Sequence, residues 1–439
     1  MIEALRNAFR VPEVRNKLLL TGFILLVYQF AIHVPVIGVD RAALQSVLSG
    51  PGAGFVGVLN LLSGGAVSNF SVLANGVYPY ITASIIFQLL IPIVPALERI
   101  QREPGGQEKL QRYTYYLAIP MAVLQSLGQI AIFNAPNIGG GGVIPGFGVD
   151  LFLTATVIIT MTAGTMFAIW LGDLITEQGI GNGLSVIIFA GIVAQAPTQL
   201  ANLLTTSNRV VYDILLFVII TLLSIVVIIY IQEGVRRIPV QYGKRVRGRK
   251  QYGGASTHIP LKVNPVGMIP LIFAQAVTTF PAIIVNLFPR GPVGDSILNV
   301  FGNQQGFGYW AFFFCLTVGF TFFYASVMIG NQNLAENLQR NGGFIPGIRP
   351  GRRTQEYIVR VTNRITLVGA LFLGTIAIVP GLVEALNGLL FEFEATTVAN
   401  NPARVIAGSG LIIVVGVVID TMRQLEAQLV MRNYEGFMR

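Results

Sequence analysis

The stretch VYDILLFVIITLLSIVVIIYI, residues 211–231, decides the fold class of this chain. Asp213 is its only charged residue, and most of its other positions are aliphatic or aromatic. About 20 mostly apolar residues are enough for a helix to cross a lipid bilayer. The whole chain shares this character, because 53% of its 439 residues are hydrophobic and only 11% are charged. The composition therefore predicts a polytopic membrane protein.

Nine further stretches match the first in length and apolar character. The second, fifth and seventh spans are the least clean because prolines interrupt them, and such breaks are tolerated where the backbone faces protein or a water-filled cavity. The sequence therefore predicts an all-α polytopic membrane protein with ten transmembrane helices. They cover residues 18–37, 76–95, 113–133, 151–171, 184–203, 211–231, 265–288, 309–330, 365–383 and 405–422.

A strongly basic segment follows the opening stretch directly. Residues 232–262 contain eight Lys or Arg, five of them in VQYGKRVRGRKQYGG (240–254). The cytosolic loops of membrane proteins are enriched in these residues. If both chain termini and the loops 96–112, 232–262 and 331–364 are cytosolic, 25 of the 29 basic residues lie on that side. The sequence therefore predicts a multi-pass protein with both termini in the cytosol.

Ten helices divide into two groups of five, residues 1–209 and 210–439. Because five is an odd number, two such groups would enter the membrane in opposite directions, as in proteins built from inverted repeats. The two parts share no clear residue-level similarity. The count of helices therefore permits an inverted repeat but does not demonstrate one.

The predicted membrane helices carry almost no charge in their interiors. Their polar residues are Gln88, Gln125, Gln129, Gln275 and several Ser and Thr. Coupled transporters bury ionisable residues near the membrane midplane, where the cost of burial implies a role in transport. The lack of such residues weighs against a secondary transporter. That class remains the alternative hypothesis, since it also uses inverted repeats and broken helices.

The sequence also argues against an enzyme. It contains no P-loop glycine motif, and no Ser/His, Ser/Lys or paired-Asp set lies within the predicted helices. His33 and His258 are far apart and Cys315 is the only cysteine, so neither a metal site nor a cofactor is predicted. A substrate of this protein must therefore be driven by something other than the chain itself.

A semi-apolar stretch, GPGAGFVGVLNLLSGGAVSNFSVLANG (50–76), separates the first two predicted helices. Gly and Ser interrupt it too often for a membrane-spanning helix. It is either an interfacial segment that only packs against the protein or a movable stopper inside a cavity, because backbone at membrane depth must be buried in protein or line water. The residues alone favour neither alternative.

Four stretches carry a resemblance to a known family. They are NGVYPYITASIIFQLL (75–90), ITEQGIGNGLSVIIFAGIVA (175–194), RRIPVQYGKRVRGRKQYGGASTHIPLKVNPVGMIP (236–270) and NLQRNGGFIPGIRPGRRTQEYI (337–358). In this order they resemble the SecY family, the central pore-forming subunit of the bacterial protein-conducting channel. The likeness extends from the first predicted helix to the tenth.

The resemblance implies an hourglass-shaped channel of two inverted five-helix halves, 1–209 and 210–439, with a plug at about 57–70. Such a channel passes unfolded, signal-bearing polypeptides across the bacterial plasma membrane and releases transmembrane segments sideways into lipid. The loop between the fifth and sixth helices would be the hinge. A thylakoid membrane would also be served if the source is photosynthetic.

The family pattern, carried over position by position, assigns residues to four parts of the channel. The implied pore ring consists of Val77, Ile81, Ile188, Ile272 and Ile413. The implied lateral gate contains Thr82, Ser84, Gln88, Asn264, Thr279 and Phe280. The implied plug includes Leu59, Leu62, Gly64, Gly65 and Phe70. The implied docking surface for partners includes Arg236, Arg237, Arg245, Arg247 and Arg349.

Physical reasoning supports the types of residue assigned to the pore ring and the gate, although it does not fix their positions. Val77 and Ile81 are four residues apart and share a helix face, and a neck of branched apolar side chains closes by excluding water. Polar side chains at a gate can hydrogen-bond across a helix seam. Asn75 and Val77 depart from the apolar residue and the isoleucine expected in the family, which bears on how tightly the gate closes.

The resemblance also implies partners for this chain. They are the membrane subunits SecE and SecG, the SecA motor ATPase, the translating ribosome, signal peptides and unfolded preproteins, all in or beside a lipid bilayer. The loops 232–262 and 331–364 together carry 14 basic residues. Such loops attract acidic or RNA-bearing partners over long distances.

Overall fold

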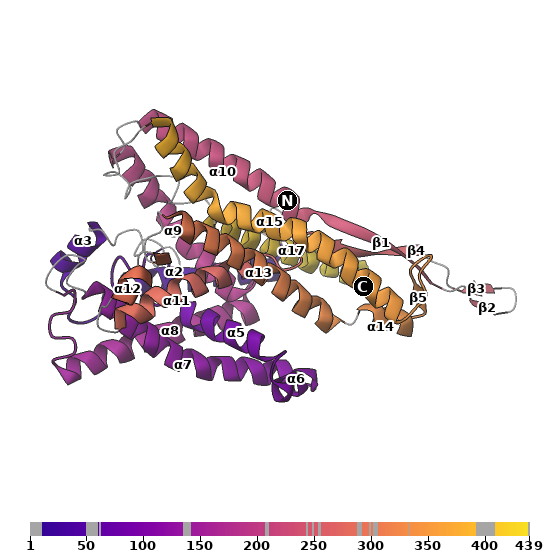
Figure 1. The fold of residues 1–439 in the computed structure, drawn as a ribbon. Helices are drawn as coiled ribbons and strands as arrows, with labels where there is room; N and C mark the ends of the chain where they lie inside the picture. The colour runs from indigo at the N-terminus through magenta and orange to yellow at the C-terminus, as the bar shows by residue number, and fades with distance from the viewer. Residues whose placement is uncertain are drawn as a thin grey trace.

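The computed structural model is an elongated bundle of helices with a small β-sheet projecting from one end (Figure 1). It describes residues 11–49, 60, 63–134, 142–206, 210–242, 245–247, 250–252, 256–287, 292–297, 300–301, 306–332, 334–391 and 409–437. The helices before residue 210 are α2 (Pro12–Ile32), α3 (Arg41–Ser49), α5 (Tyr78–Leu90), α6 (Pro95–Arg102), α7 (Gly106–Phe133), α8 (Leu151–Gln178) and α9 (Gly183–Thr206). Those that follow are α10 (Val210–Glu233), α11 (Ile269–Leu287), α12 (Pro292–Ile297), α13 (Phe307–Gln332), α14 (Leu334–Arg340), α15 (Arg352–Phe391) and α17 (Ser409–Phe437).

Each of the ten predicted membrane spans overlaps a helix, although the first, 18–37, runs five residues past the end of α2 at Ile32. Among the described residues, six helices are long and apolar enough to cross a membrane, namely α2, α7, α8, α10, α13 and α15. The other four predicted spans fall on α5, α9, α11 and α17. The all-helical prediction therefore holds for the part of the chain that lies in the membrane.

The second predicted span, 76–95, is wrong at its far end. α5 stops at Leu90, and α6 leaves it at an angle of 105°. Pro95 is the first residue of α6, and Val94 before it has an extended backbone with φ −102° and ψ 107°. A proline disfavours helical backbone in the preceding residue but fits the first turn of a helix. The chain therefore bends at this proline.

The seventh span begins later than predicted, at Ile269 rather than at residue 265. Asn264 closes a turn ahead of it, because its side chain donates to the Gly267 carbonyl at 3.0 Å and accepts from the Gly267 N–H at 3.1 Å. Gly267 has a φ of +67°, a left-handed conformation that glycine adopts without steric cost. This turn sets the start of α11.

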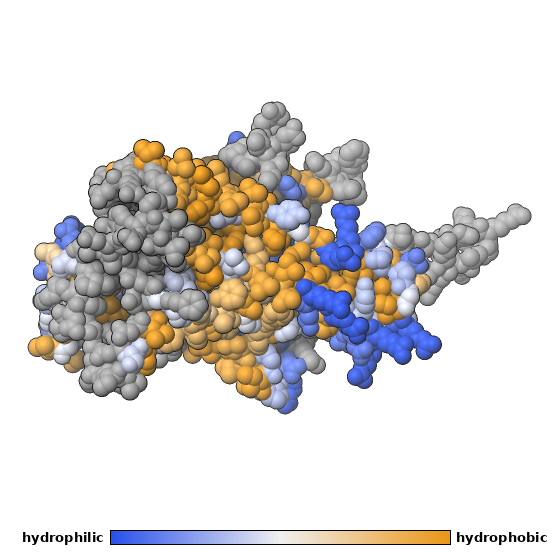
Figure 2. All heavy atoms as spheres, turned by 45° about the horizontal axis from the view of Figure 1, so that its top comes forward, coloured by the Kyte–Doolittle hydropathy of each residue, from blue (hydrophilic) through white to orange (hydrophobic). Residues whose placement is uncertain are grey.

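Apolar side chains cover the outside of the bundle. On α10, Leu223, Val226 and Tyr230 are 63%, 64% and 80% exposed. Figure 2 shows apolar surface over the middle of the molecule and hydrophilic residues gathered toward the end that carries the sheet. An apolar surface of this extent is stable in contact with lipid, where the helical backbone satisfies its own hydrogen bonds.

The two cytosolic loops expected at 232–262 and 331–364 meet in one antiparallel sheet of order β4-β1-β5. Ile238 and Val240 of the central strand are buried against Leu338, Ile345 and Ile358. The sequence analysis predicted these segments only as loops. The strands are β1 (Val235–Tyr242), β2 (Arg245–Arg247), β3 (Lys250–Tyr252), β4 (Ser256–Lys262) and β5 (Gly343–Phe344).

Helices from before and after residue 210 contact each other on two sides of the bundle. On one side α9 packs against α10 and α17. On the other side α11 packs against α5 and α7. The interior between these two contacts holds the largest apolar cluster and the candidate site.

Candidate functional site

One buried cluster in the middle of the molecule contains branched apolar side chains from α2, α8, α9, α10, α11, α15 and α17. Val77 at the start of α5, Ile188 of α9, Ile272 of α11 and Ile413 of α17 belong to it. Their exposed fractions are only 1%, 6%, 8% and 2%. Ile81, one turn after Val77, is partly buried and packs against the same cluster. The five residues assigned to a pore ring, which are spread over most of the chain, thus belong to this one cluster or pack against it.

This arrangement suits a water-excluding barrier. Side chains of Val and Ile offer no hydrogen bond to water, so a narrow neck lined by them closes by dewetting. Such a barrier also fits around many different side chains, because apolar packing is not directional. The cluster can therefore separate two aqueous compartments without recognising one particular solute.

The segment assigned to the plug packs onto α9. The Gln195 side-chain amide donates to the Asn60 carbonyl at 2.8 Å and accepts from the Asn60 side chain at 3.3 Å. Gly64, at φ +70°, touches Gly191 so closely that a Cβ on Gly191 would lie 2.5 Å from the Gly64 Cα. Gly65 follows with φ +97°. Of the other plug candidates, Leu59 and Leu62 lie outside the described residues.

Two residues that the sequence did not single out, one in the plug segment and one just after it, belong to the apolar cluster. Ala66 and Leu73 are fully buried within it, beside the ring candidates. Phe70 instead belongs to a neighbouring cluster, where its ring meets Phe133 edge to face with centroids 5.1 Å apart. Its φ of +42° is unusual for a residue other than glycine. Of these residues, Ala66 in the plug segment and Leu73 just after it lie in the same cluster as the ring candidates, whereas Phe70 does not.

Backbone hydrogen bonds hold the end of this segment to the chain that follows α2. The Val36 N–H donates to the Phe70 carbonyl at 3.0 Å, and the Val72 N–H donates to the Val34 carbonyl at 3.0 Å. A β-bridge between Pro35 and Ser71 lies between them. This short ladder fixes the segment at the end where it leads into α5.

A buried polar network ties the start of α5 to α7. The Asn75 side chain donates to the Ser126 hydroxyl at 2.7 Å and to the Ala122 carbonyl at 3.3 Å. Gln129 donates to the Ala74 carbonyl at 3.3 Å. Asn75 departs from the apolar residue expected in the family, and its amide nitrogen has polar partners in the interior, whereas its Oδ1 is buried without one.

The seam between α5 and α11 is apolar. Tyr78 and Ile85 of α5 form a cluster with Phe273 and Ala276 of α11. The Phe273 ring meets the rings of Phe320 and Tyr324 from α13 edge to face, at centroid distances of 6.2 and 6.0 Å. Edge-to-face pairs contribute beyond the area they bury. Apolar contacts therefore close this side of the bundle.

Thr82, Ser84, Gln88 and Asn264, polar candidates for a lateral gate, hydrogen-bond within their own segments. Thr82 donates to the Tyr78 carbonyl at 2.8 Å, and Gln88 donates to Ser84 at 3.1 Å. Asn264 bonds to Gly267 in the turn before α11. The side chains of Thr279 and Phe280 lie outside the described residues. Bonding back to the same segment is the ordinary behaviour of such side chains in helices.

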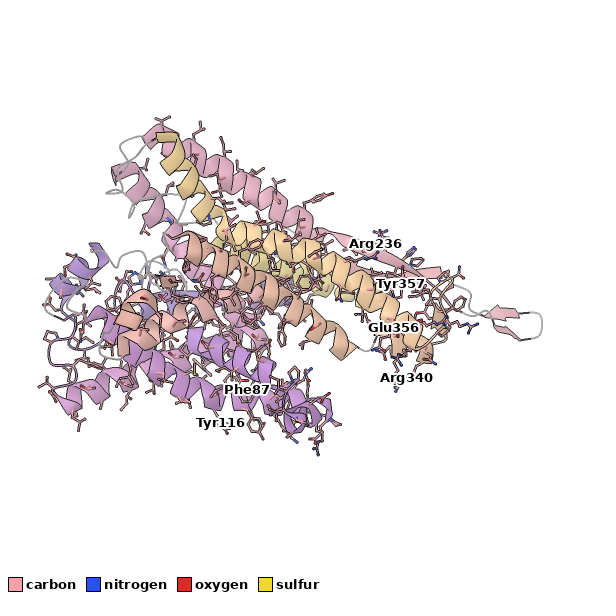
Figure 3. All side chains as sticks on the ribbon, viewed as in Figure 1. Phe87, Tyr116, Arg236, Arg340, Glu356 and Tyr357 are labelled. Atoms are coloured by element: carbon pink, nitrogen blue, oxygen red, sulfur yellow. The ribbon has the colours of Figure 1, made fainter. Side chains whose placement is uncertain are left out.

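The basic candidates for partner docking lie at the end that carries the sheet. Arg236 and Arg237 are exposed on β1, and Figure 3 shows Arg236 there, with Arg340, Glu356 and Tyr357 on nearby elements. Arg349 is exposed in the loop between β5 and α15, where its carbonyl accepts from the Thr354 hydroxyl at 3.0 Å. The side chains of Arg245 and Arg247 in β2 lie outside the described residues.

A polar cluster that the sequence analysis did not predict joins α7 to α8. The Tyr115 hydroxyl donates to both carboxylate oxygens of Asp173, at 2.9 and 2.8 Å. Gln111 donates to the same hydroxyl at 2.8 Å, and the Tyr80 ring of α5 lies 5.4 Å from the Tyr115 ring. The cluster links α5, α7 and α8 at one end of the bundle. Among the described residues, no group of three or more His, Cys, Asp or Glu could hold a metal ion.

Known proteins resemble this chain over its length. A family model described as SecY matches residues 71–422. The protein translocase subunit SecY of Halalkalibacterium halodurans is 41% identical over 452 residues, and that of Streptomyces scabiei is 38% identical over 451 residues. Both alignments cover 100% of this chain and 100% of the relative.

Solved protein-conducting channels share the fold. A SecY structure that addresses how the plug domain stabilises the closed state and maintains a membrane seal has a TM-score of 0.62 and 19% identity. A protein-conducting channel has a TM-score of 0.60 at 19% identity, and Sec61 from the canine ribosome-channel complex has one of 0.58 at 18% identity. Each comparison covers 94% of this chain and 92% of the other.

Proposed function

This chain belongs to the SecY family, and we propose that Val77, Ile81, Ile188, Ile272 and Ile413 form the ring that closes its protein-conducting pore. Members of the family are translocation channels and not enzymes, so the chain is a multi-pass channel subunit of the bacterial plasma membrane. The alternative hypothesis of a secondary transporter is wrong, because the relatives that match the whole chain are translocase subunits.

The observation that carries the ring proposal is that all five side chains belong to one buried apolar cluster or pack against it. They come from the start of α5 and from α9, α11 and α17. Residues that only face lipid, or that only pack one helix against its neighbour, would come from one or two helices. A closed neck needs apolar side chains from all around it, and this chain supplies them.

The segment from residue 57 to about 70 acts in this proposal as the plug. Its support is the packing of Ala66 beside the ring candidates and the contact of Gly64 with Gly191. One structure with the same fold has a plug domain that maintains a membrane seal. Displacement of this segment would leave the ring as the remaining barrier around a moving polypeptide.

The lateral gate in this proposal is the seam between α5 and α11. Tyr78, Ile85 and Phe273 close it by apolar packing. An arriving hydrophobic signal sequence can replace such contacts with its own, because apolar burial is not directional and exchanges one apolar partner for another. The division of the chain into residues 1–209 and 210–439 fits this arrangement. The two halves contact each other through α11 on one side and through α9 on the other.

The end that carries the sheet faces the cytosol in this proposal, together with both termini. Val14 near the start of α2 packs with Met422 and Leu425 of α17, and Arg423 pairs with Glu233 of α10 at 2.8 Å. These contacts bring both ends of the described chain beside the basic loops. The positive-inside rule then gives the orientation.

The partners proposed for this chain are SecE and SecG in the membrane and SecA or the translating ribosome at the basic end. A related channel, Sec61, has been observed in a complex with the ribosome. Arg236, Arg237 and Arg349 are exposed at that end and available to acidic or RNA-bearing surfaces. Among these, Arg349 is the residue proposed for coupling to the motor, with Arg245 and Arg247 as further docking candidates.

The proposal is tested by reconstituting the chain with SecE and SecG homologues in proteoliposomes. The measurement is ATP- and SecA-dependent uptake of an unfolded secretory precursor into a protease-protected compartment. We expect uptake only when the precursor carries its signal sequence. Loss of uptake without a signal sequence supports gating at the seam, whereas equal uptake of both precursors contradicts it.

A further inference from the structure

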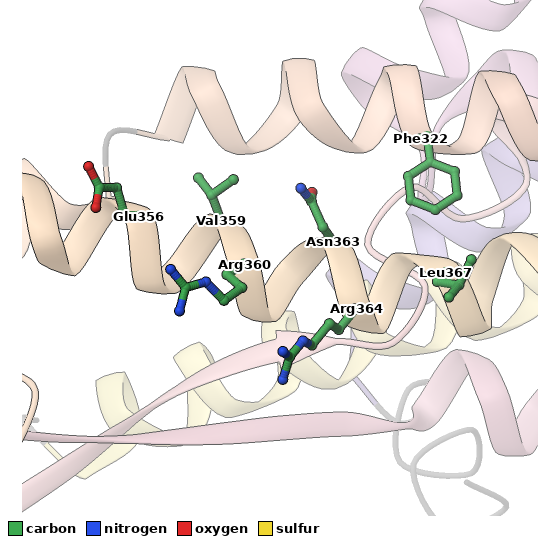
Figure 4. A pocket seen from close by; sticks show the side chains of 7 residues that line it. All are labelled: Phe322, Glu356, Val359, Arg360, Asn363, Arg364 and Leu367. Atoms are coloured by element: carbon green, nitrogen blue, oxygen red, sulfur yellow. The ribbon is translucent and has the colours of Figure 1, made fainter.

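A groove runs between α13 and α15 on the side of the bundle nearest the sheet. It has a volume of about 600 Å³. Figure 4 shows Phe322 entering it from α13, while the other six lining residues come from α15. They are Glu356, Val359, Arg360, Asn363, Arg364 and Leu367. The groove belongs neither to the neck nor to the α5–α11 seam.

The groove crosses the boundary between the basic loop and the membrane. Arg364 is the last basic residue of α15, and the apolar part of the predicted span begins at residue 365. Leu367 and Leu371, one and two turns deeper, are 48% and 46% exposed on the outside of the bundle. One end of the groove is therefore at the level of lipid headgroups, and the other is at the level of acyl chains.

The headgroup end carries unneutralised positive charge. Arg360 and Arg364 are exposed and lie four residues apart, which places them on one face of α15. The only carboxylate lining the groove, Glu356, pairs with Arg352 at 3.2 Å. Within the described part of the chain, no ion pair is formed by Arg360 or Arg364. The groove thus presents two guanidinium groups and the Asn363 amide to an anionic ligand.

We propose that this groove binds an anionic phospholipid. The guanidinium groups of Arg360 and Arg364 donate hydrogen bonds to the phosphate oxygens, a pairing for which the planar guanidinium is well suited. Phe322 and Leu367 lie deeper and contact an acyl chain. Basic pockets between transmembrane helices on the cytosolic side have this combination of charge and apolar surface. An acidic peptide would match the charge but not the apolar end that continues into the lipid-facing surface.

The test uses the full-length chain, purified with its membrane subunits, and native mass spectrometry with added phosphatidylglycerol or phosphatidylcholine. We expect a preference for phosphatidylglycerol that falls about 30-fold in the double variant R360Q/R364Q, because each basic residue at an anionic surface contributes a factor of roughly five. Arg353 is also exposed on α15 but neither lines the groove nor pairs with Glu356. The control R353Q is expected to keep the preference.

Two further measurements separate lost charge from a misfolded groove and identify the molecule that occupies the groove. The variant R360K/R364K retains both charges and is expected to keep most of the preference, which separates lost charge from a misfolded groove. A photo-crosslinking residue in place of Val359 should capture lipid in membranes of mixed composition. An unchanged preference in R360Q/R364Q would overturn the proposal, and so would crosslinking to a polypeptide in place of lipid.

Discussion

Ile272 lies in the central cluster with branched side chains from several other helices, so a polar replacement there changes both hydration and packing. In the variant Ile272→Asn we expect water to enter the neck and the closed channel to conduct ions. The free energy of unfolding should fall by roughly 1–3 kcal/mol, since a buried polar group without partners costs about that much. Conductance across planar bilayers measures the leak, and thermal melting of the purified complex measures the stability.

Ile272→Val is the matched control, because it keeps a branched apolar side chain at the same place. It should lose about 1 kcal/mol of stability and stay closed. The equivalent change at the partly buried Ile81 extends the test to α5. If Ile272→Asn and Ile81→Asn both leave conductance unchanged, neither residue lines the pore.

Gly191 offers a second test, because its contact with Gly64 joins backbone to backbone. A Cβ at this position would lie 2.5 Å from the Gly64 Cα, and neither backbone has a flexible side chain that could move aside. Gly191→Ala should push the plug segment off α9 at a cost of about 1–3 kcal/mol and raise the resting conductance. A disulfide-trapping assay between the plug segment and α9 would report the displacement.

The control for this variant is Gly319→Ala in α13. A Cβ on Gly319 meets nothing within 4 Å, so alanine there should be neutral or slightly stabilising in the helix. Both variants add one methyl group to a glycine in a membrane helix. Identical conductance and melting in the two would show that the Gly64–Gly191 contact does not hold the plug segment.

The sequence predicted some residues of the candidate site but not others. The ring candidates were predicted through the family pattern, since an isoleucine in a membrane helix has no local signal that separates a pore from a lipid-facing position. Ala66 and Leu73 had no such signal, because their neighbours in the cluster come from helices far along the chain. The Asn75–Ser126 bond joins residues 51 positions apart, and the Tyr115–Asp173 bond joins residues 58 apart. Partners at such separations are set by the fold.

At the scale of elements, the α5–α11 seam depends on Phe273 and its contacts with Phe320 and Tyr324 of α13. Phe273→Ala removes both edge-to-face pairs and should weaken the seam by about 3–5 kcal/mol in the closed state. We expect precursors with a defective signal sequence to be exported more efficiently. Export of a reporter with a shortened hydrophobic core in its signal sequence measures this.

Phe23→Ala is the control for the seam variant. Phe23 is exposed on α2, away from the cluster that Phe273 forms with α5. It should leave export of the defective precursor at the level of the unmodified chain. If Phe273→Ala behaves like Phe23→Ala, the closed seam does not depend on these ring contacts.

The elements themselves differed in how far the sequence could predict them. Apolar runs of about 20 residues are a strong signal, and all ten overlap helices. The bend after Leu90 was missed, although Pro92 and Pro95 were visible, because proline inside a membrane helix can also be accommodated without a break. The sheet was missed because β5 is only two residues long and pairs with a strand about 100 residues earlier.

At the scale of the whole molecule, Arg349 lies where the channel would meet its motor. It is exposed and its side chain forms no ion pair within the described part of the chain. Arg349→Glu should slow SecA-driven export by at least about tenfold, because reversing a charge at a complementary interface costs several kcal/mol. Folding should be unaffected, since the side chain is outside the packed cluster of the cytosolic loops.

Arg353→Glu provides the comparison for this charge reversal. Arg353 is also exposed and lies on the first turn of α15. Export rates in proteoliposomes, at equal amounts of inserted complex, should distinguish the two variants. Equal rates would mean that total charge at this end matters and that Arg349 has no specific part.

The sheet has a mechanical consequence for the molecule. β1 begins two residues after α10 ends, and β4 ends seven residues before α11 begins. The Val263 N–H donates to the Gly234 carbonyl at 2.8 Å and clamps the two strands at their base. A partner that binds β1 or β4 and displaces them would therefore pull on the chain that leads into α11, the helix on one side of the α5–α11 seam.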